Sequence, residues 1–317
     1  MDVSSVLTVK KYTSLQQRFP GITTASNLDS NQARVLIFGR GITPEQLSGV
    51  ESLAGVTLEV VAAWQVGTYD ALLIGNALSD ALEQAVIEYR LDCVRADELP
   101  NLSDPGLVVM DMDSTAIEIE CIDELAVLAG VGEQVAAVTE RAMQGELDFE
   151  QSLRQRVAAL AGADEGILQT VRTSLPMMPE LRELVATLHH FGWKAAIASG
   201  GFTYFSDYLK EELNLDHAQS NTLEIADGKL TGRVLGDVVD AQVKADILRA
   251  LAEQHEIAPH NTVAVGDGAN DLLMIKSAGL GIAYHAKPKV EAQAPAVIRY
   301  ADLGGVLCIL SASLYRI

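Results

Sequence analysis

The sequence predicts an α/β protein in which a small N-terminal α+β domain precedes a doubly wound parallel sheet. After residue 104, short apolar runs alternate with helical segments, a pattern typical of parallel strands covered by helices on both faces. Before residue 103, the predicted order is strand, helix, strand, strand, helix, strand, which is the split βαβ arrangement of ferredoxin-like domains. A chain of 317 residues agrees with about two domains.

The N-terminal elements follow from local signals. Thr43 and Pro44 predict a helix start, because Thr caps free helix N–H groups and Pro fits the first turn. Residues 1–30 show no firm period, and we assign them no element. The expected elements are a strand at 35–38, a helix from 43, strands at 56–66 and 69–74 around Gly67, a helix at 77–90 and a strand at 91–94. This order resembles that of a small ACT-type regulatory domain, which implies amino-acid binding.

Pro100 and the stretch Ser103-Asp-Pro-Gly106 predict a linker, so we place the two domains at residues 1–103 and 104–317. In the second domain we expect strands at 107–110, 194–198, 262–265 and 280–283, short strands at 217–235 around Asp227-Gly228, and helices at 179–191, 202–213, 241–256 and 272–278. A helical stretch at about 118–178 separates the first two of these strands and is too long for a plain crossover. We expect it to form an inserted cap above the carboxyl edge of the sheet.

The composition excludes several kinds of partner. A net charge of −20 disfavours nucleic acid and anionic membranes. The three cysteines are odd in number and lack metal-site spacing, which indicates reduced thiols. No apolar run reaches the length of a membrane span, and Met1 is not followed by a signal peptide. We therefore expect a soluble cytoplasmic protein without nucleic-acid or membrane partners.

Two carboxylates end the first strand of the second domain. The run Leu107–Met110 is apolar without alternation, as in a buried parallel strand, and Asp111 and Asp113 follow it directly. Open α/β sheets bind their ligands at this carboxyl edge. Such a pair in isolation would indicate a turn or a helix cap, since Asp and Ser favour both.

Polar residues at three further places complete a set. Ser199-Gly-Gly201 follows the strand that ends at Ala198, Gly266-Asp-Gly-Ala-Asn-Asp271 follows the strand that ends at Val265, and Lys244 lies in the helix between them. Taken singly, Ser199-Gly-Gly201 would be a helix-start turn and Lys244 part of a solvated helix face. Together they favour phosphoryl transfer.

Phosphoryl transfer needs residues of these types. A carboxylate can attack phosphorus when a divalent cation screens the two anions, and Mg²⁺ prefers oxygen ligands such as Asp111 and Asp267, with Asn270 or Asp271 in support. The Ser199 hydroxyl and the backbone at Gly200 can hold phosphate oxygens. Lys244 adds positive charge for the transition state, and Asp113 can protonate the leaving alkoxide and later deprotonate water.

These motifs, in this order, resemble those of the haloacid dehalogenase superfamily, whose core is a Rossmann-like doubly wound sheet. The resemblance becomes closer in residues 111–124 and 143–157 and in Ser199-Gly-Gly-Phe202, which are similar to the phosphoserine phosphatase family, the last enzyme of serine biosynthesis. It covers about residues 107–310. Leu272-Leu273 departs from it, since a proline is expected there in close relatives.

The resemblance implies a role for each site residue. Asp111 would be the nucleophile that forms an aspartyl phosphate, and Asp113 the general acid and base. Mg²⁺ would be bound by Asp111, the backbone oxygen of Asp113, and Asp267. The remaining roles are phosphoryl binding by Ser199, Gly200 and Lys244 with Asn270 beside them, ammonium binding by Glu120, carboxylate binding by Arg156, and cap lining by Met143 and Phe149. An amino acid needs one acid and one base for recognition, and Arg suits a carboxylate.

Other functions remain open from the sequence alone. A phosphatase or phosphotransferase for phosphothreonine or phosphohomoserine would use the same residues. A phospho-accepting signalling domain also has an Asp, a hydroxyl and a Lys on a doubly wound sheet, although Asp113 would shorten the life of its phosphoaspartate. An amino-acid-binding regulatory protein with a relict phosphatase half is a further alternative. The N-terminal domain is expected to mediate homodimerisation or feedback by serine.

Overall fold

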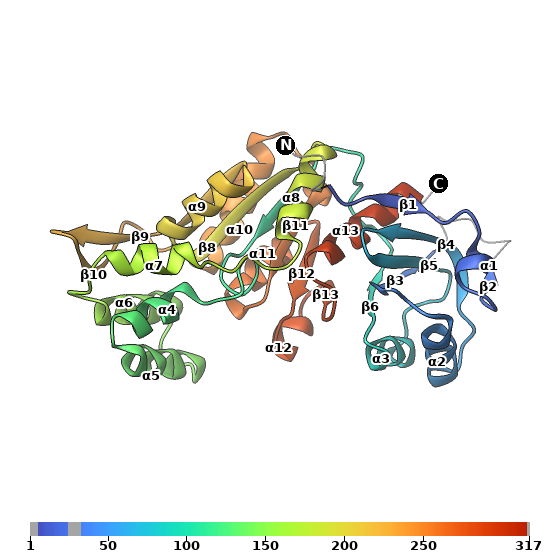
Figure 1. Cartoon of the computed structure of the whole chain (residues 1–317), viewed down its shortest axis with the longest axis horizontal. Helices are drawn as coiled ribbons and strands as arrows, with labels where there is room; N and C mark the ends of the chain where they lie inside the picture. Colours follow the sequence, from blue (N-terminus) through green and yellow to red (C-terminus); the bar gives the residue numbers. More distant parts are fainter. Residues whose placement is uncertain (1–5, 25–32, 316–317) are drawn as a thin grey trace.

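The computed structural model describes residues 6–24 and 33–315, and its N-terminal part forms a mainly antiparallel sheet (Figure 1). The sheet has the order β1-β4-β5-β3-β6, and β3 pairs antiparallel with both β5 and β6. This is the split βαβ arrangement, so the ferredoxin-like prediction is confirmed. The strands are β1 (Val9–Lys11), β2 (Thr23–Thr24), β3 (Val35–Arg40), β4 (Glu59–Val66), β5 (Tyr69–Ile74) and β6 (Asp92–Arg95).

Helices α2 (Pro44–Ala54) and α3 (Asp80–Glu88) cover one face of this sheet. Thr43 caps α2 as predicted: its hydroxyl accepts a hydrogen bond from Gln46 N at 3.2 Å, while its own N–H donates to the Gln46 side chain at 2.9 Å. The assignment of no element to residues 1–30 was wrong for β1, β2 and α1 (Leu15–Arg18). β1 lies at the sheet edge and is held by pairing with β4, which local sequence does not reveal. Residues 1–5 and 25–30 lie outside the described part.

The second sheet has the order β10-β9-β8-β7-β11-β12-β13 and is parallel except for the β9–β10 hairpin. Its first strand in sequence, β7, therefore lies between β8 and β11. The strands are β7 (Leu107–Met110), β8 (Lys194–Phe202), β9 (His217–Ala226), β10 (Lys229–Leu235), β11 (Thr262–Gly266), β12 (Leu280–Tyr284) and β13 (Ala296–Ile298). This order brings together the strand ends that carry the predicted site residues.

Helices cover both faces of this sheet, as the doubly wound prediction requires. One face packs on α8 (Leu181–His190), α9 (Thr203–Leu213) and α13 (Gly304–Ser311), and the other on α10 (Ala241–Gln254) and α11 (Leu272–Ser277). Side chains alternate along β7, so Val108 contacts the first group of helices and Val109 the second. The elements α12 (Pro288–Glu291), β13 and α13 were not predicted.

The expected cap is present between β7 and α8 (Figure 1). It consists of α4 (Cys121–Leu128), α5 (Gly132–Met143), α6 (Phe149–Ala159) and α7 (Gly166–Thr173). Two segments join it to the core: linker 1 (residues 115–120) and linker 2 (residues 174–180). They pair with each other, since Glu118 N donates to Pro176 O and Met178 N donates to Ala116 O, both at 2.9 Å. Figure 1 shows the cap at the opposite end of the molecule from the N-terminal sheet.

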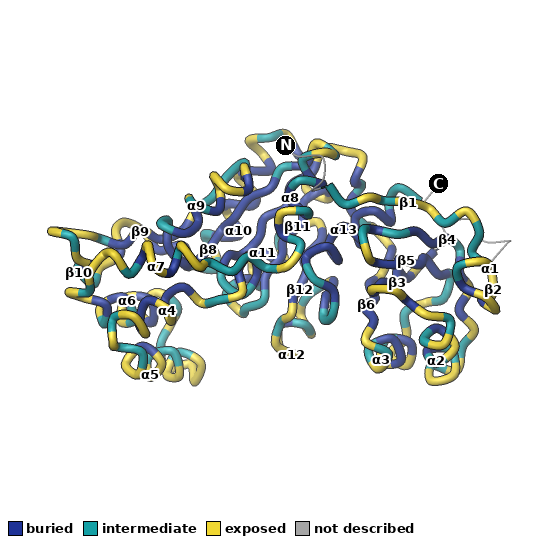
Figure 2. The backbone as a smooth tube through the Cα atoms, in the orientation of Figure 1, coloured by how far each residue is buried: buried dark blue, intermediate teal, exposed yellow. Residues whose placement is uncertain are grey.

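Helix α13 lies between the two sheets, and all of its residues are buried (Figures 1 and 2). Leu36 and Phe38 of the N-terminal sheet belong to the same hydrophobic core as α13 and the second sheet. The Trp64 indole N–H donates to Ser311 Oγ at 2.8 Å. The N-terminal sheet is thus packed onto the rest of the protein, and the domain boundary near residue 103 stays a prediction. Within residues 6–24 and 33–315, no helix has the length and apolar character needed to cross a membrane.

Candidate active site

The carboxyl end of β7 positions the predicted nucleophile and the predicted acid–base residue. Asp111 N donates to Val265 O of the neighbouring strand at 3.0 Å, which extends the sheet pairing one residue beyond β7. Met112 N donates to Asp111 Oδ1 at 2.7 Å and orients that carboxylate. The backbone N–H of Cys121, at the start of α4, donates to Asp113 Oδ1 at 3.2 Å. Both predicted catalytic acids therefore lie at one sheet edge with defined orientations.

Lys244 lies inside this site, so the solvated-helix alternative is wrong for it. Its Nζ is 2.8 Å from Asp111 Oδ1 and 2.7 Å from Asp271 Oδ1, and its side chain has 0% exposure. Burial alone would lower the pKa of Lys244, but the charges of Asp111 and Asp271 outweigh it and hold that pKa above its ordinary value. Asp271 also accepts a hydrogen bond from Gly268 N at 2.9 Å. Lys244 is consequently a charged group fixed between two acids.

Three carboxylates converge beside Lys244. One oxygen from each of Asp111, Asp267 and Asp271 lies within 4.8 Å of the others. Burial raises the pKa of Asp111, and the charge of Asp271 adds to this, while Lys244 opposes it. Burial and then the charge of Asp271 raise the pKa of Asp267 to about 7. Such mutual repulsion is what a bound cation relieves.

The donor set fits a divalent cation. Asp271 is engaged with Lys244 and Gly268, whereas the Asp267 carboxylate receives, from side chains of residues 6–24 and 33–315, only a 3.4 Å contact from the Thr115 hydroxyl. The assignment of Asp111 and Asp267 as metal ligands stays a prediction, and hard oxygen ligands of this kind suit Mg²⁺ or Ca²⁺ rather than softer metals. Asp271 supports the site by holding Lys244.

Asp113 faces the loop that was predicted to bind phosphate. A Cβ placed on Gly201 would be 2.7 Å from Asp113 Oδ2 and 3.1 Å from Ser199 Oγ, so only glycine allows these groups to approach. Desolvation, followed by the charge of Glu120, raises the pKa of Asp113 to about 7. A carboxyl group with this pKa can both hold and release a proton near neutral pH.

The strand before α9 is longer than predicted. We expected it to end at Ala198, but β8 continues with an irregular register to Phe202, and α9 begins at Thr203. Ser199 Oγ accepts a hydrogen bond from Gly201 N at 2.9 Å. The buried side chain of Asn221 donates to Gly200 O at 2.8 Å, which fixes the loop from β9.

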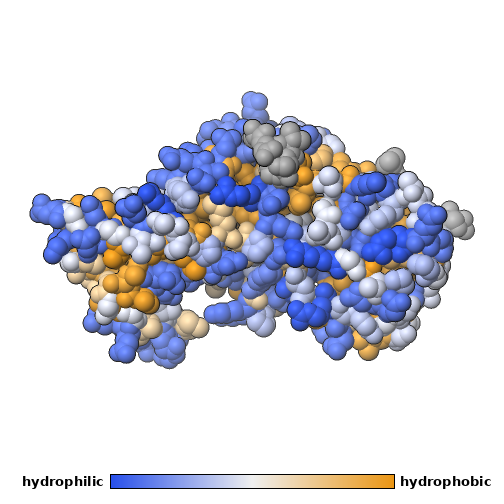
Figure 3. Space-filling model, in the orientation of Figure 1, coloured by the Kyte–Doolittle hydropathy of each residue, from blue (hydrophilic) through white to orange (hydrophobic). Residues whose placement is uncertain are grey.

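Cap residues reach this loop. The ring of Phe149 lies over Gly200, because a Cβ on Gly200 would be 2.5 Å from Phe149 Cζ. Glu120, at the end of linker 1, accepts a hydrogen bond from Ser114 Oγ at 2.9 Å. Met143 is 67% exposed, and the cap residues Val127 and Leu128 are exposed as well. Figure 3 shows apolar surface at the cap end of the molecule. The structure therefore places Phe149 against the site and leaves Met143 at the surface.

Arg156 has an unusual environment for a charged residue. Its Nε is buried and has no hydrogen-bond partner among the described residues. Burial lowers the pKa of Arg156, while the negative charges of Asp123, Glu120 and Asp113 oppose that shift. An unsatisfied buried guanidinium N–H is costly unless a ligand accepts from it. Arg156 is thus available for an anion in the space that it shares with these acids.

Several residues of the site were missed in the sequence. Thr115 contacts Asp267, and Asn221 links the Ser199 loop to Val239, whose N–H donates to Asn221 Oδ1 at 2.8 Å. Ser114 has a left-handed backbone with φ of +58°. Ser114 and Thr115 belong to the same short motif as Asp111, so this motif could have indicated them. No signal near Asn221 could have done so, since its partners come from distant segments. Asn270, which was predicted, lies beside Gly268 in the loop after β11.

The comparisons with known proteins agree with this geometry. The family model for haloacid dehalogenase-like hydrolases matches residues 105–279. A phosphoserine phosphatase of Vibrio cholerae is 59% identical over 99% of this chain and 96% of its own length. The chain belongs to the phosphoserine phosphatase family of the haloacid dehalogenase superfamily. Membership of this family excludes the alternative that the chain is a phospho-accepting signalling domain.

Other known proteins are also similar to this chain over nearly its whole length. A phosphoserine phosphatase of Haemophilus influenzae is 50% identical over 96% of this chain and 98% of its own. The crystal structure of a probable phosphoserine phosphatase from Vibrio cholerae, in unliganded form, covers 99% of this chain and 97% of its own with a TM-score of 0.92. Residues 31–95 match a family model for a domain of unknown function, DUF5609. The ACT-type resemblance of the N-terminal part therefore stays a prediction.

Proposed function

We propose that this phosphatase hydrolyses O-phospho-L-serine to L-serine and phosphate with Mg²⁺, as the last step of serine biosynthesis in the cytoplasm. The observation that carries the proposal is the pairing of Asp111 with Lys244 at 2.8 Å, beside Asp113, at the end of the central strand β7. The two relatives similar over nearly the whole chain carry the name phosphoserine phosphatase, which supports the same substrate.

The proposed reaction assigns each chemical step to one residue. An Asp111 oxygen attacks phosphorus, the bond from phosphorus to the serine oxygen breaks, and the departing alkoxide takes a proton from Asp113. Asp113, now a carboxylate, removes a proton from water, and the resulting hydroxide attacks the phosphorus of the aspartyl phosphate. The bond to Asp111 breaks and phosphate leaves. The pKa of about 7 for Asp113 agrees with both roles.

The phosphoryl group needs positive and hydrogen-bonding partners. Lys244 and the Ser199–Gly200 segment would hold its oxygens, and Asn270 lies beside them. Mg²⁺, held by Asp111, the backbone oxygen of Asp113 and Asp267, would supply charge screening between the carboxylate and the phosphate. Asp271 keeps Lys244 in position through its 2.7 Å contact.

The cap would select a small amino-acid phosphate. Arg156 offers an unsatisfied buried Nε for the substrate carboxylate, and Glu120 offers a carboxylate for its ammonium group. Phe149, which covers Gly200, would limit access of water during phosphoryl transfer. The same residues would accept phosphothreonine or phosphohomoserine, so the assay must compare these compounds.

The test measures phosphate release with and without EDTA from O-phospho-L-serine, phosphothreonine and phosphohomoserine. It adds O-phosphoethanolamine, which lacks the carboxylate. We expect phosphoserine to be preferred and its turnover to be lost on chelation. Arg156→Gln should remove the preference for phosphoserine over phosphoethanolamine, because only the carboxylate contacts Arg156. Arg154→Gln is the matched control, since Arg154 is on the same helix but pairs with Glu150 at the surface. Equal wild-type rates on phosphoserine and phosphoethanolamine would contradict the proposed substrate.

A further inference from the structure

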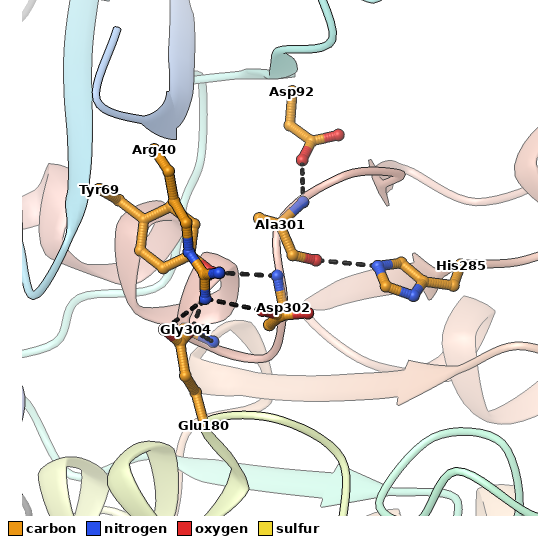
Figure 4. Close-up of polar contacts among 8 residues, drawn as sticks. All are labelled: Arg40, Tyr69, Asp92, Glu180, His285, Ala301, Asp302 and Gly304. Carbon is orange, nitrogen blue, oxygen red and sulfur yellow. Dashed lines mark hydrogen bonds and ion pairs between the residues drawn. The ribbon is translucent and has the colours of Figure 1, made fainter.

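Linker 2 ends at Glu180, whose carboxylate is bound by the N-terminal sheet (Figure 4). Arg40 Nη2 lies 2.7 Å from Glu180 Oε1, and the Tyr69 hydroxyl donates to Glu180 Oε2 at 2.8 Å. Gly304 N, at the start of α13, donates to the same oxygen at 3.1 Å. Three segments far apart in the sequence therefore converge on one carboxylate at the end of the cap linker.

Arg40 and Tyr69 are themselves held in place. They are paired residues at the ends of β3 and β5, and the Arg40 guanidinium lies 4.9 Å from the centre of the Tyr69 ring. Arg40 also contacts Asp302 at 2.7 Å, and Asp302 N donates to the Tyr69 hydroxyl at 3.0 Å (Figure 4). Tyr69 is 1% exposed. This arrangement presents two donors to Glu180 from the ends of two neighbouring inner strands.

The backbone of Glu180 is in a conformation that needs such support. Its φ is +66°, in the left-handed region, where a residue other than glycine is strained. Glu180 also starts α8, and Leu184 N donates to its carbonyl at 2.8 Å. A strained residue persists only when its contacts determine it, and the contacts here include the N-terminal sheet.

This strained residue lies close to the segments that carry the cap. Met178, two residues before Glu180, pairs with Ala116 of linker 1. Linker 1 follows Asp113 and Ser114 directly and ends at Glu120, the residue proposed to bind the substrate ammonium. A change in the direction of linker 2 at Glu180 therefore reaches both linkers and the cap side of the active site.

Attachment of the N-terminal sheet does not depend on Glu180. Asp92 of β6 accepts hydrogen bonds from the backbone N–H groups of Arg299 at 2.7 Å and Ala301 at 2.8 Å, and α13 fills the space between the sheets. His285 contacts Ala301 O at 2.9 Å on the other side of the same loop (Figure 4). The contacts of Arg40 and Tyr69 with Glu180 are thus additional to those that attach the sheet.

We propose that Arg40 and Tyr69 are positioning residues for the phosphatase reaction, which act through Glu180 to fix the core end of linker 2 and thereby the position of the cap relative to the core. The consequence for substrate binding rests on the proposed function, but the consequence for the linkers does not. We call the contacts of Arg40 and Tyr69 with Glu180 the clamp. Loss of the clamp should weaken the cap contacts to the substrate and leave the groups around Asp111 in place.

The experiment compares Arg40→Gln and Tyr69→Phe with Arg95→Gln in the full-length protein. Arg95 ends β6 of the same sheet and is exposed, so its replacement removes the same charge without touching Glu180. Two measurements are made: hydrogen exchange of the Glu118 and Met178 amides, and kcat and KM for phosphoserine. Thermal midpoints identify any variant that is unfolded at the assay temperature.

We expect faster exchange at both amides and a KM raised roughly five-fold with kcat within about two-fold for Arg40→Gln and Tyr69→Phe. Arg40→Lys should restore part of the effect and Arg95→Gln should show none. Linker exchange equal to that of Arg95→Gln would overturn the inference, whatever the substrate. A wild-type protein that does not hydrolyse phosphoserine would instead contradict the proposed function, and the exchange result would still decide on the clamp.

Discussion

The ammonium group of Lys244 lies 2.7 Å from Asp271 Oδ1, and both side chains are completely buried. The same ammonium group lies 2.8 Å from Asp111 Oδ1. One buried ammonium group therefore forms ion pairs with two carboxylates, one of which belongs to the proposed nucleophile. Asp271 has no chemical role of its own in the proposed reaction, yet it determines where the charge of Lys244 lies.

Replacement of Lys244 by Met tests this relationship, since Met keeps much of the length of the stem and removes the charge. We expect kcat to fall by about 10²–10³-fold, because a positive group near the transferring phosphoryl oxygens is lost. Removing one partner of a buried pair leaves the other charges uncompensated, so the free energy of unfolding should fall by about 3–5 kcal/mol. Steady-state kinetics and urea unfolding measure the two effects.

Lys276→Met is the matched control, because Lys276 is exposed and contacts only the Gln293 side chain at 2.9 Å among the described residues. It should change neither quantity appreciably. A Lys244→Met protein with kcat within about ten-fold of the wild type would show that Lys244 does not stabilise the transition state.

Mg²⁺ should stabilise the protein more at pH 8 than at pH 5.5. The raised pKa values of Asp267 and Asp113, both about 7, mean that the folded state binds more protons than the unfolded state between about pH 4 and pH 7. Stability from these acids is therefore present at low pH and is lost as the pH rises through 7. Mg²⁺ competes with these protons, so its binding to Asp111 and Asp267 strengthens in the same range.

Thermal midpoints at both pH values, with and without Mg²⁺, measure this effect. At a Mg²⁺ concentration of about 100 times Kd, binding adds about 2.7 kcal/mol of stability. Asp267→Asn should remove most of the shift, whereas Asp246→Asn, at an exposed position of α10, should keep it. An equal shift at the two pH values would exclude proton competition at these acids.

The sequence predicted the central parts of the fold because they rest on local patterns. Leu107–Met110 has one apolar run and an abrupt end in acids, so both the strand and the place of Asp111 could be inferred. The fold of the N-terminal part followed from its order of elements. In contrast, β1 has a sequence without firm period and becomes a strand only through its pairing with β4.

The site residues that belong to sequence motifs were predicted. Those whose contacts come from distant segments were missed. Asp111 and Asp267 come together because the parallel strands β7 and β11 end at one edge, which the alternation of elements already implied. Asn221 and Glu180 act through contacts across more than one segment, and nothing beside them in the sequence indicates those contacts. The burial of Lys244 could not be predicted from local sequence patterns, because it depends on the contacts of Lys244 with both Asp111 and Asp271.

Removal of the N-terminal domain tests whether the proposed division at residues 103 and 104 separates independent units. A fragment of residues 104–317 would expose the face of α13 that packs on the N-terminal sheet, including the position of Gly305, where an added Cβ would lie 3.2 Å from Phe38 Cε2. It would also leave Ser311 without the Trp64 indole. We expect this fragment to aggregate or to bind a hydrophobic dye, and its thermal midpoint to fall, because a large apolar face meets water.

Co-expression of residues 1–103 as a separate chain is the control, since it restores the missing face without a covalent link. It should prevent aggregation of the fragment, as measured by size-exclusion chromatography. Dye binding, as measured by fluorescence, should be close to that of the full chain. The fragment 104–317 could instead remain unaggregated, keep its thermal midpoint and bind no dye. That result would show that α13 is stable without the N-terminal sheet packed on it. In that case the N-terminal sheet would be an appended domain, and residues 104–317 would be an independent unit.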